Sequence, residues 1–315
     1  MNKILRQNTV DLAAARALFA AWLAPRLGGQ ARSTFDAWAE ALAGGVDDGE
    51  FCVLLSRACR LAEQRPLKPN ATECAAASEL LVGLNPERWS ELETMRVALV
   101  LARSDLNQQS GAAALEEAFR YADMGELCAL YRCLAFLPDG ARFAWRCGEG
   151  HRTNMVSVFE ANALDTPYPA THLDDTALFQ IVIKCLHLAS PLWRLVGLDG
   201  RLNSDLARMA LDLADERRSA LRPVQPMLWL CLGQNGGQRA ASSLALELKQ
   251  GSVAGRRGAA LGCGRAGLTE ELELALLEEK ELLVRDSLTK ALSGHITQEM
   301  FAALETPDAI TKENN

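Results

Sequence analysis

The sequence predicts an all-α protein of stacked antiparallel helix pairs, either a HEAT-like α-solenoid or a compact α-helical repeat domain. Hydrophobic residues make up 49% of the chain and aromatic residues only 6%. Ala and Leu, which a helix accommodates at little cost, supply most of the apolar content. Alternating apolar runs of strand length, rich in Val, Ile and Thr, are missing. We therefore expect about twelve helices or more and no sheet.

Helix starts are predicted where a capping side chain precedes an acid within one turn. These signals are Asn8 with Asp11, Asp47 or Asp48 with Glu50, Asn70 with Glu73, and Asn85 with Pro86 and Glu87. Behind the first signal, apolar residues recur at three- and four-residue steps, namely Leu12, Ala15, Phe19, Trp22 and Leu23. Phe35, Trp38 and Leu42 repeat this spacing after a start at Ser33. Each helix thus has one apolar face that a neighbour must cover.

Turns are predicted at glycines that separate the periodic stretches: Gly28-Gly29, Gly44-Gly45, Gly83, Gly125 and Pro138-Asp139-Gly140. We expect Trp22, Trp38, Phe159 and Trp229 to be largely buried, because each lies at apolar helical spacing. Near the C-terminus, the stretch 256–262, a turn at Gly267, and the stretches 271–277 and 284–288 have the rhythm of HEAT-like repeats. The expected division is a helical array over 1–150, a central segment over 151–230, HEAT-like repeats over 231–305 and a frayed tail over 306–315.

Charge and cysteine usage limit the partners and the compartment. The formal net charge is −7, with 33 basic and 40 acidic residues and no basic tract, so we expect no nucleic-acid partner. Nine cysteines are scattered without a C-x-x-C, which favours a reducing compartment and thiols that act as small hydrophobes. The first residues form no secretory signal, and no window approaches about 18 uncharged apolar residues. The chain is thus expected to be cytoplasmic, without a transmembrane segment and with at most peripheral membrane contact.

No metal or cofactor is expected. The four histidines, His151, His172, His187 and His295, never approach a two-ligand spacing. Asp174-Asp175 lacks a third carboxylate and is explained by a helix N-terminus. A Gly-rich phosphate loop and a Gly-x-Ser-x-Gly elbow are also missing, so no catalytic residue is assigned.

The central segment differs from its flanks because polar residues there stand beside turn-formers and aromatics. It contains, in order, Arg152-Thr153-Asn154-Met155, Val158-Phe159-Glu160-Ala161, Pro167-Tyr168-Pro169-Ala170, Gly197-Leu198-Asp199-Gly200-Arg201-Leu202-Asn203, and the stretch 206–217. These blocks resemble the EboA family. The family pattern also falls on Gln180, Lys184, Pro191, Asp212, Glu216, Pro226 and Trp229, and the chain departs from it at Phe179, Gly200 and Arg218.

The resemblance implies a component of the bacterial ebo gene cluster, which is linked to moving secondary-metabolite precursors out of the cytoplasm. Its partners would be other ebo-cluster proteins or a small metabolite, and no enzymatic activity is implied for this component. The candidate ligand- or partner-binding residues are Arg152, Asn154, Glu160, Tyr168, Gln180, Lys184, Asp199, Arg201, Asn203, Asp212 and Arg217.

Each candidate residue also has a structural interpretation. Pro167-Tyr168-Pro169 is predicted to form a rigid extended loop, in which Tyr168 either lines a polar pocket or packs a corner. Glu160 and Lys184 form either an internal ion pair or a site. Asn203 can cap the helix from Ser204, whereas Arg201 and Arg217 offer forked donors either to an anion or to the nearby acids Asp212, Asp215 and Glu216.

Two classes of function follow from these interpretations. The first is a helical adaptor or binding protein whose central polar segment forms a groove. The second is an enzyme acting on a prenylated or sugar-like intermediate, with Glu160 and Asp199 as acid–base groups and Arg201 as an anion clamp. In both cases Asn154, Glu160, Tyr168, Lys184, Asp199, Arg201 and Arg217 are expected to cluster, because buried polar groups must satisfy one another.

Overall fold

The structure, a computed structural model, describes residues 10–305. Within them the chain forms sixteen α-helices and eight short 3-10 helices, with no strand beyond an isolated bridge between Pro66 and Ser90. The prediction of an all-α fold is therefore confirmed. The helices fall into two compact units, which meet in sequence at Ala177 and Leu178, inside α11 (Asp175–Leu188). The expected division at 150 and 230 stays a prediction, and the expected frayed tail lies outside the described residues.

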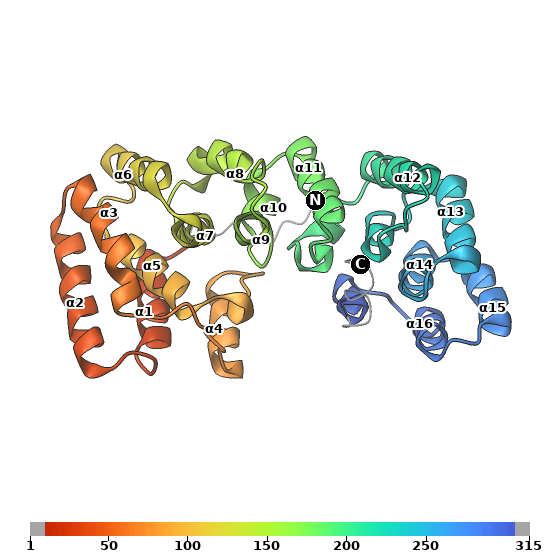
Figure 1. The fold of residues 1–315 in the computed structure, drawn as a ribbon, viewed down its shortest axis with the longest axis horizontal. Helices are drawn as coiled ribbons and strands as arrows, with labels where there is room; N and C mark the ends of the chain where they lie inside the picture. The colour runs from red at the N-terminus through yellow and green to blue at the C-terminus, as the bar shows by residue number, and fades with distance from the viewer. Residues whose placement is uncertain (1–9, 306–315) are drawn as a thin grey trace. The chain divides into compact units, whose positions relative to one another are not determined.

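The N-terminal unit contains the first ten α-helices (Figure 1). They are α1 (Leu12–Leu23), α2 (Gly29–Gly44), α3 (Asp48–Arg57), α4 (Ala71–Leu80), α5 (Glu91–Ala102), α6 (Gln109–Tyr121), α7 (Met124–Cys133), α8 (Ala144–Gly150), α9 (Val156–Ala163) and α10 (Tyr168–His172). Its 3-10 helices are η1 (Ala58–Arg60), η2 (Pro86–Arg88), η3 (Leu134–Phe136) and η4 (Gly140–Phe143).

Helix α5 is the centre of this unit. Of its twelve residues, all but Ala102 are buried, because α1, α2, α3 and α7 pack around it. An aromatic cluster of Phe19, Trp22, Trp89 and Phe136 packs beside it, with ring centroids 5.1 to 6.4 Å apart. Rings at these separations favour tilted and edge-to-face packing, which adds to the free energy of burial. The apolar face predicted for the first helix thus forms part of the core.

The predicted capping signals mark real helix starts. Asp47 caps α3, Asn85 caps η2, and Asn70 forms a full capping box with Glu73 at the start of α4. Asp11 caps α1 by accepting the backbone N–H groups of Ala13 and Ala14. The companion residue in that first signal, Asn8, lies outside the described residues.

Two predictions for this unit were wrong. No helix begins at Ser33, because α2 starts at Gly29 and continues through it. Gly125 does not form a turn: it is the second residue of α7, where the capping box of Asp123 and Glu126 fixes the helix start. Of the four aromatic residues expected to be largely buried, Trp22, Phe159 and Trp229 are buried, and Trp38 is half-buried with the Arg57 guanidinium 5.3 Å from its ring.

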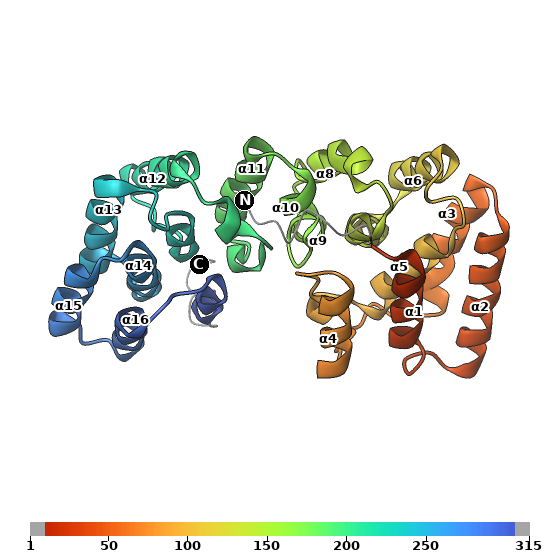
Figure 2. The same ribbon diagram turned by 180° about the vertical axis from the view of Figure 1, so that it is seen from behind.

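The C-terminal unit contains the remaining helices. They are α11 from Leu178 onward, α12 (Ser204–Ser219), α13 (Gly237–Gln250), α14 (Val253–Ala266), α15 (Thr269–Glu278) and α16 (Leu282–Ser293). The 3-10 helices are η5 (Leu192–Arg194), η6 (Leu198–Arg201), η7 (Pro226–Cys231) and η8 (Gln298–Leu304). Both views of the ribbon show α12, α13 and α15 in one layer and η7, α14 and α16 in the other (Figures 1 and 2).

Helix α14 holds the two layers of this unit together, and its glycines explain how. It packs against α13, α15, α16, η7 and η8. A Cβ atom at Gly258 would lie 2.4 Å from the Pro226 carbonyl oxygen, and one at Gly262 would lie 2.9 Å from the Trp229 Cβ. Glycine lowers helix propensity, but here it lets η7 approach the helix backbone closely. The glycine-rich stretch that resembled a repeat is thus a packing surface.

The cysteines behave mainly as core residues. Six are buried, namely Cys128, Cys133, Cys147, Cys185, Cys231 and Cys263. Burial raises the pKa of the Cys128 thiol to about 11 and that of the Cys231 thiol to about 12. These thiols are held in their neutral form, which suits the predicted role as small hydrophobes.

Candidate functional site

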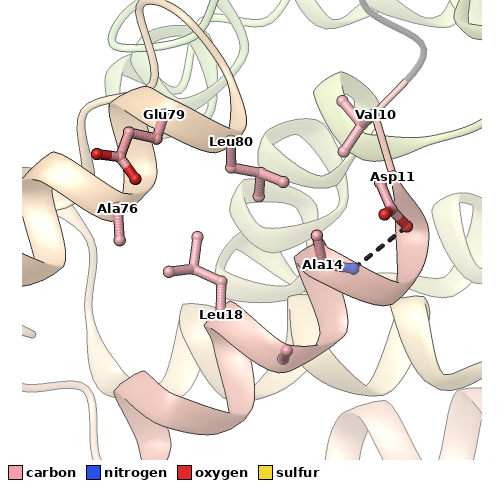
Figure 3. A pocket seen from close by; sticks show the side chains of 8 residues that line it. Val10, Asp11, Ala14, Leu18, Ala76, Glu79 and Leu80 are labelled. Carbon is pink, nitrogen blue, oxygen red and sulfur yellow. Dashed lines mark hydrogen bonds between the residues drawn. The ribbon is translucent and has the colours of Figure 1, made fainter.

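A surface hollow opens in the N-terminal unit between α1 and α4 (Figure 3). Its volume is about 610 Å³, within the range of about 300 to 1,000 Å³ that is typical of small-molecule sites. The residues that line it are Val10, Asp11, Ala14, Ala17, Leu18, Ala76, Glu79 and Leu80. Six of these eight side chains are aliphatic, so most of the wall is apolar.

The two walls of the hollow, α1 and α4, are antiparallel helices. An ion pair joins the end of α1 to the start of α4. Arg26, just beyond α1, donates to both carboxylate oxygens of Glu73 in the first turn of α4, at 2.6 and 2.8 Å. The two side chains are only 13 and 14% exposed. The start of α1 and the end of α4 therefore lie together at the other end, where Val10, Asp11, Glu79 and Leu80 line the hollow. This anchoring sets the spacing of the walls before any ligand arrives.

The electrostatics of the hollow select against anions. Asp11 and Glu79 are its two charged residues and both are acidic; no basic side chain lines it. One oxygen of Asp11 accepts the N–H groups of Ala13 and Ala14 at 2.8 and 3.3 Å, which fixes this carboxylate at the start of α1. Figure 3 shows the bond to Ala14. A ligand that fits these walls is therefore apolar, with a neutral or positively charged polar end.

The structure places four of the sequence-predicted candidates in the N-terminal unit. Arg152 is exposed and pairs with Glu149 at 2.5 Å, while Asn154 is exposed just before α9. Glu160 is half-buried on α9. Tyr168 is 2% exposed and its hydroxyl donates to the Gly140 carbonyl at 2.6 Å. This is the arrangement expected if Tyr168 packs a corner.

The prediction of an extended Pro-Tyr-Pro loop was wrong. Pro167 has helical dihedral angles, with φ at −77° and ψ at −6°, and Tyr168 and Pro169 begin the short helix α10. Proline is accepted in a first helical turn because the amide proton it lacks would have no partner there. The ring of Tyr168 lies 4.6 Å from that of His172 across this turn, and burial lowers the pKa of the His172 imidazole.

The other seven candidates lie in the C-terminal unit. Gln180 is exposed and Lys184 half-buried on α11, and Arg201 is half-buried on η6. Asn203 caps α12 by accepting the N–H groups of Asp205 and Leu206, as predicted. Asp199 pairs with Arg265 at 2.5 Å, and Arg217 donates to the Pro223 carbonyl.

Asp212 belongs to a surface network on α12 and α13. Arg208 reaches it at 3.2 Å, and Arg239 reaches it at 2.8 Å and Asp215 at 2.6 Å. The guanidinium that bridges Asp212 and Asp215 thus comes from α13, whereas the sequence favoured Arg201 and Arg217. Exposed ion pairs of this kind contribute little to the free energy of unfolding. We therefore interpret this network as ordinary solvent-exposed charge and not as a binding site.

The predicted clustering of seven polar residues stays a prediction. Asn154, Glu160 and Tyr168 belong to one unit, and Lys184, Asp199, Arg201 and Arg217 to the other. The Glu160–Lys184 pair is likewise divided between the units. Asp174 accepts the Ala177 N–H at 2.8 Å, which confirms that Asp174-Asp175 marks a helix start. Among residues 10–305 no group of three or more His, Cys, Asp or Glu side chains is placed to hold a metal ion.

The comparison with protein families decides the relationship. A family model described as metabolite traffic protein EboA matches residues 15–233, more than half of the chain. The chain belongs to the EboA family. No curated protein and no solved structure matches it. The match to the EboA family covers the N-terminal unit from Ala15 and the C-terminal unit as far as Gly233, so it includes the predicted polar residues and five of the eight residues that line the hollow. No helix within the described part of the chain is long and apolar enough to cross a membrane.

Sequence reasoning missed the hollow, although the chain carries a faint signal for it. On α1, Ala14, Ala17 and Leu18 continue the apolar surface beyond the core residues Ala15, Phe19 and Trp22. The apolar arc of this helix is thus wider than one packed face requires. Small aliphatic residues on a helix are usually core residues, so their pattern does not predict a ligand site. The resemblance to the EboA family predicted a site of polar residues instead.

Proposed function

We propose that the chain is a helical binding protein that handles a small metabolite, and that the hollow between α1 and α4 is its ligand site. The observation that carries this proposal is the hollow itself: a concave surface of about 610 Å³ lined by six aliphatic residues and two acids. It suits an apolar molecule with a neutral or cationic end. Membership in a family described by metabolite traffic supports the same role.

The contacts of the candidate polar residues favour binding over catalysis. A general acid or base has to reach a substrate, and several candidates are already engaged within their own unit. Asp199 is paired with Arg265, Asn203 caps a helix, and Tyr168 is buried against Gly140. These contacts support the adaptor interpretation over an enzyme that uses Asp199 as a proton carrier.

We extend the proposal to the cellular setting that the family resemblance implies. The chain would work in the cytoplasm with other ebo-cluster proteins, in the processing or export of secondary-metabolite precursors. The hollow would hold the apolar part of such a precursor while partner proteins act on it or pass it on.

Two fluorescent probes of matched shape test the site. N-phenyl-1-naphthylamine is neutral and apolar, and 8-anilinonaphthalene-1-sulfonate adds a sulfonate to the same skeleton. The walls predict saturable binding of the neutral probe and weaker binding of the anion, because Asp11 and Glu79 repel it. Glu79→Gln removes one of these charges and is expected to strengthen binding of the anionic probe more than that of the neutral one.

A matched pair of variants assigns the binding to the hollow. Ala17→Phe with Ala76→Phe fills it, since both residues line its walls. Ala13→Phe with Ala75→Phe makes the same changes at exposed positions of the same helices outside the hollow. The first variant is expected to weaken binding of the neutral probe about 10-fold or more, and the second to leave it unchanged. Equal binding by both variants would refute the assignment.

A further inference from the structure

An apolar surface on α15 and α16 of the C-terminal unit is exposed. Leu274, Leu277, Leu282 and Leu283, on the second half of α15 and the first residues of α16, are 65, 83, 78 and 46% exposed. We call these four residues the leucine patch. The core faces of the same helices are supplied by other residues, because Leu272, Val284 and Leu288 are buried. The four leucines of the patch therefore do not take part in the core packing of α15 and α16.

The position of the patch makes this exposure unusual. Leu274 and Leu277 are three residues apart on α15, so their side chains are neighbours on one helix surface. Helical proteins normally keep their exposed helix faces polar, because an exposed apolar face associates with other molecules. Here the exposed surfaces of α15 and of the start of α16 carry leucines instead. Such a face is typical of a surface that binds a partner.

The charges around the patch select the partner. Residues 269–285 contain six Glu against Lys280 and Arg285, and the Arg285 guanidinium donates to the Leu276 and Glu279 carbonyls. Glu279 is committed to Arg256, which donates to it at 2.7 Å and lowers the pKa of its carboxyl against the opposing effect of burial. Glu270, Glu273 and Glu278 are exposed beside the leucines. An occupant that combines apolar side chains with positive charge complements this surface.

We propose that the leucine patch is the docking site for a positively charged amphipathic helix of a partner protein. Such a helix places apolar anchors three or four residues apart against the leucines and its Lys or Arg side chains against the exposed glutamates. A second copy of the chain is disfavoured, because a symmetric contact through this patch sets glutamates against glutamates. An anionic lipid surface is disfavoured for the same electrostatic reason. The patch lies beyond the family match of 15–233 and in the other unit from the hollow, so this inference goes beyond the proposed metabolite binding.

Two designed peptides test the proposal on the full chain. Both are fluorescein-labelled amphipathic helices with leucines on one face, and the polar face is lysine in one and glutamate in the other. Fluorescence anisotropy is expected to show binding of the lysine peptide that weakens as salt is raised, and no binding of the glutamate peptide. Glu273→Gln with Glu278→Gln is expected to weaken the lysine peptide about 3-fold or more.

The leucines are tested against a matched control. Leu277→Ser with Leu282→Ser is expected to weaken the lysine peptide about 10-fold with little change in melting temperature, since both side chains are exposed. Leu221→Ser changes a leucine that is 95% exposed outside the patch and is expected to leave binding unaltered. Equal loss in both variants, or none in either, would overturn the proposal. So would dimerisation in sedimentation, or binding to vesicles of anionic lipid, that Leu277→Ser with Leu282→Ser abolishes.

Discussion

Glu93 of α5 and Arg132 of α7 form an ion pair at 3.3 Å in which each side chain is only 8% exposed. The other oxygen of Glu93 accepts the Ser90 N–H at 2.7 Å and so closes the capping box of α5. The Arg132 guanidinium lies 5.1 Å from the Trp89 ring. One carboxylate thus fixes the start of a helix and joins that helix to the end of its neighbour.

The same device recurs in the N-terminal unit. Three capping boxes each use a glutamate that also pairs with an arginine from another segment. The pairs are Glu73 with Arg26, Glu93 with Arg132, and Glu126 with Arg96. Because Glu126 begins α7 and Arg96 lies on α5, the two helices are joined at two points along their antiparallel contact. The boxes therefore set both where helices begin and which helices pack together.

Removing Glu93 is expected to destabilise the fold strongly. Glu93→Ala leaves the Arg132 charge buried and the Ser90 N–H without its capping partner, a loss of about 3 to 5 kcal/mol in the free energy of unfolding. Urea unfolding of the two single variants and of Glu93→Ala with Arg132→Ala gives their coupling. Glu117→Ala serves as the control, because its pair with Arg120 is exposed and is expected to be worth less than about 1 kcal/mol. Similar losses for Glu93 and Glu117 would contradict this interpretation.

The pair of Glu73 and Arg26 is expected to make stability depend on acid pH. The hydrogen bond from Arg26 lowers the pKa of the Glu73 carboxyl below its usual value. A depressed pKa contributes stability that is present above the unfolded value of about 4.3 and is lost as the pH falls through the folded value. Glu73→Gln is therefore expected to reduce the free energy of unfolding by about 1 to 2 kcal/mol at pH 7, and less below pH 4.

Urea unfolding between pH 7 and pH 3 measures this difference. Glu40→Gln changes an exposed acid of α2 and is expected to stay within about 0.5 kcal/mol of the wild type throughout. A loss in Glu73→Gln that is constant over this pH range would argue against the ion pair as its cause.

The close approach of η7 to α14 is expected to make Gly258 intolerant of a side chain. Gly258→Ala places a Cβ 2.4 Å from the Pro226 carbonyl oxygen, so the helices must separate, at a cost of about 1 to 3 kcal/mol. Gly148→Ala on α8 meets no atom within 4 Å and is expected to raise stability by about 0.5 to 1 kcal/mol. Melting temperatures that move in opposite directions confirm the contact, and a stabilising Gly258→Ala would disprove it.

Asp199 is expected to act as a structural residue. Its carboxylate neutralises Arg265, whose side chain is 7% exposed, and Asp199→Ala leaves that guanidinium with the Ile296 carbonyl. Because Asp199 itself is 46% exposed, a loss of about 1 kcal/mol in the free energy of unfolding is expected. Glu216→Ala, at an exposed position on α12, is the control and is expected to be close to neutral. An Asp199→Ala protein with unchanged stability that fails to bind a metabolite would instead place Asp199 in a site.

The fold was predictable because its signals are local. Asn70 with Glu73 and Asp47 with Glu50 mark helix starts through contacts within one turn, and the apolar face of α1 follows from spacing alone. The start of α10 at Tyr168 was not predictable, because prolines occur both in the first turn of a helix and in extended loops.

The partners of charged residues were harder to predict than the helices. Arg265 reaches Asp199 across sixty-six positions, and Arg26 reaches Glu73 across forty-seven. The spacing of residues in the sequence does not predict contacts over such separations. The sequence therefore predicted ion pairs between acids and bases that are close in the chain. The hollow was missed for a related reason, because the shape of a gap between two helices depends on their separation and not on the residue types alone.

The central claim, that the α1–α4 hollow binds an apolar metabolite, is tested most directly by identifying what copurifies with the protein. Mass spectrometry of small molecules released from the purified chain is expected to find an apolar compound with a neutral or basic polar end in the wild type. The same compound is expected with Ala13→Phe and Ala75→Phe combined, and to be lost with Ala17→Phe and Ala76→Phe combined. The same compound, retained in equal amounts by both variants, would contradict the assignment.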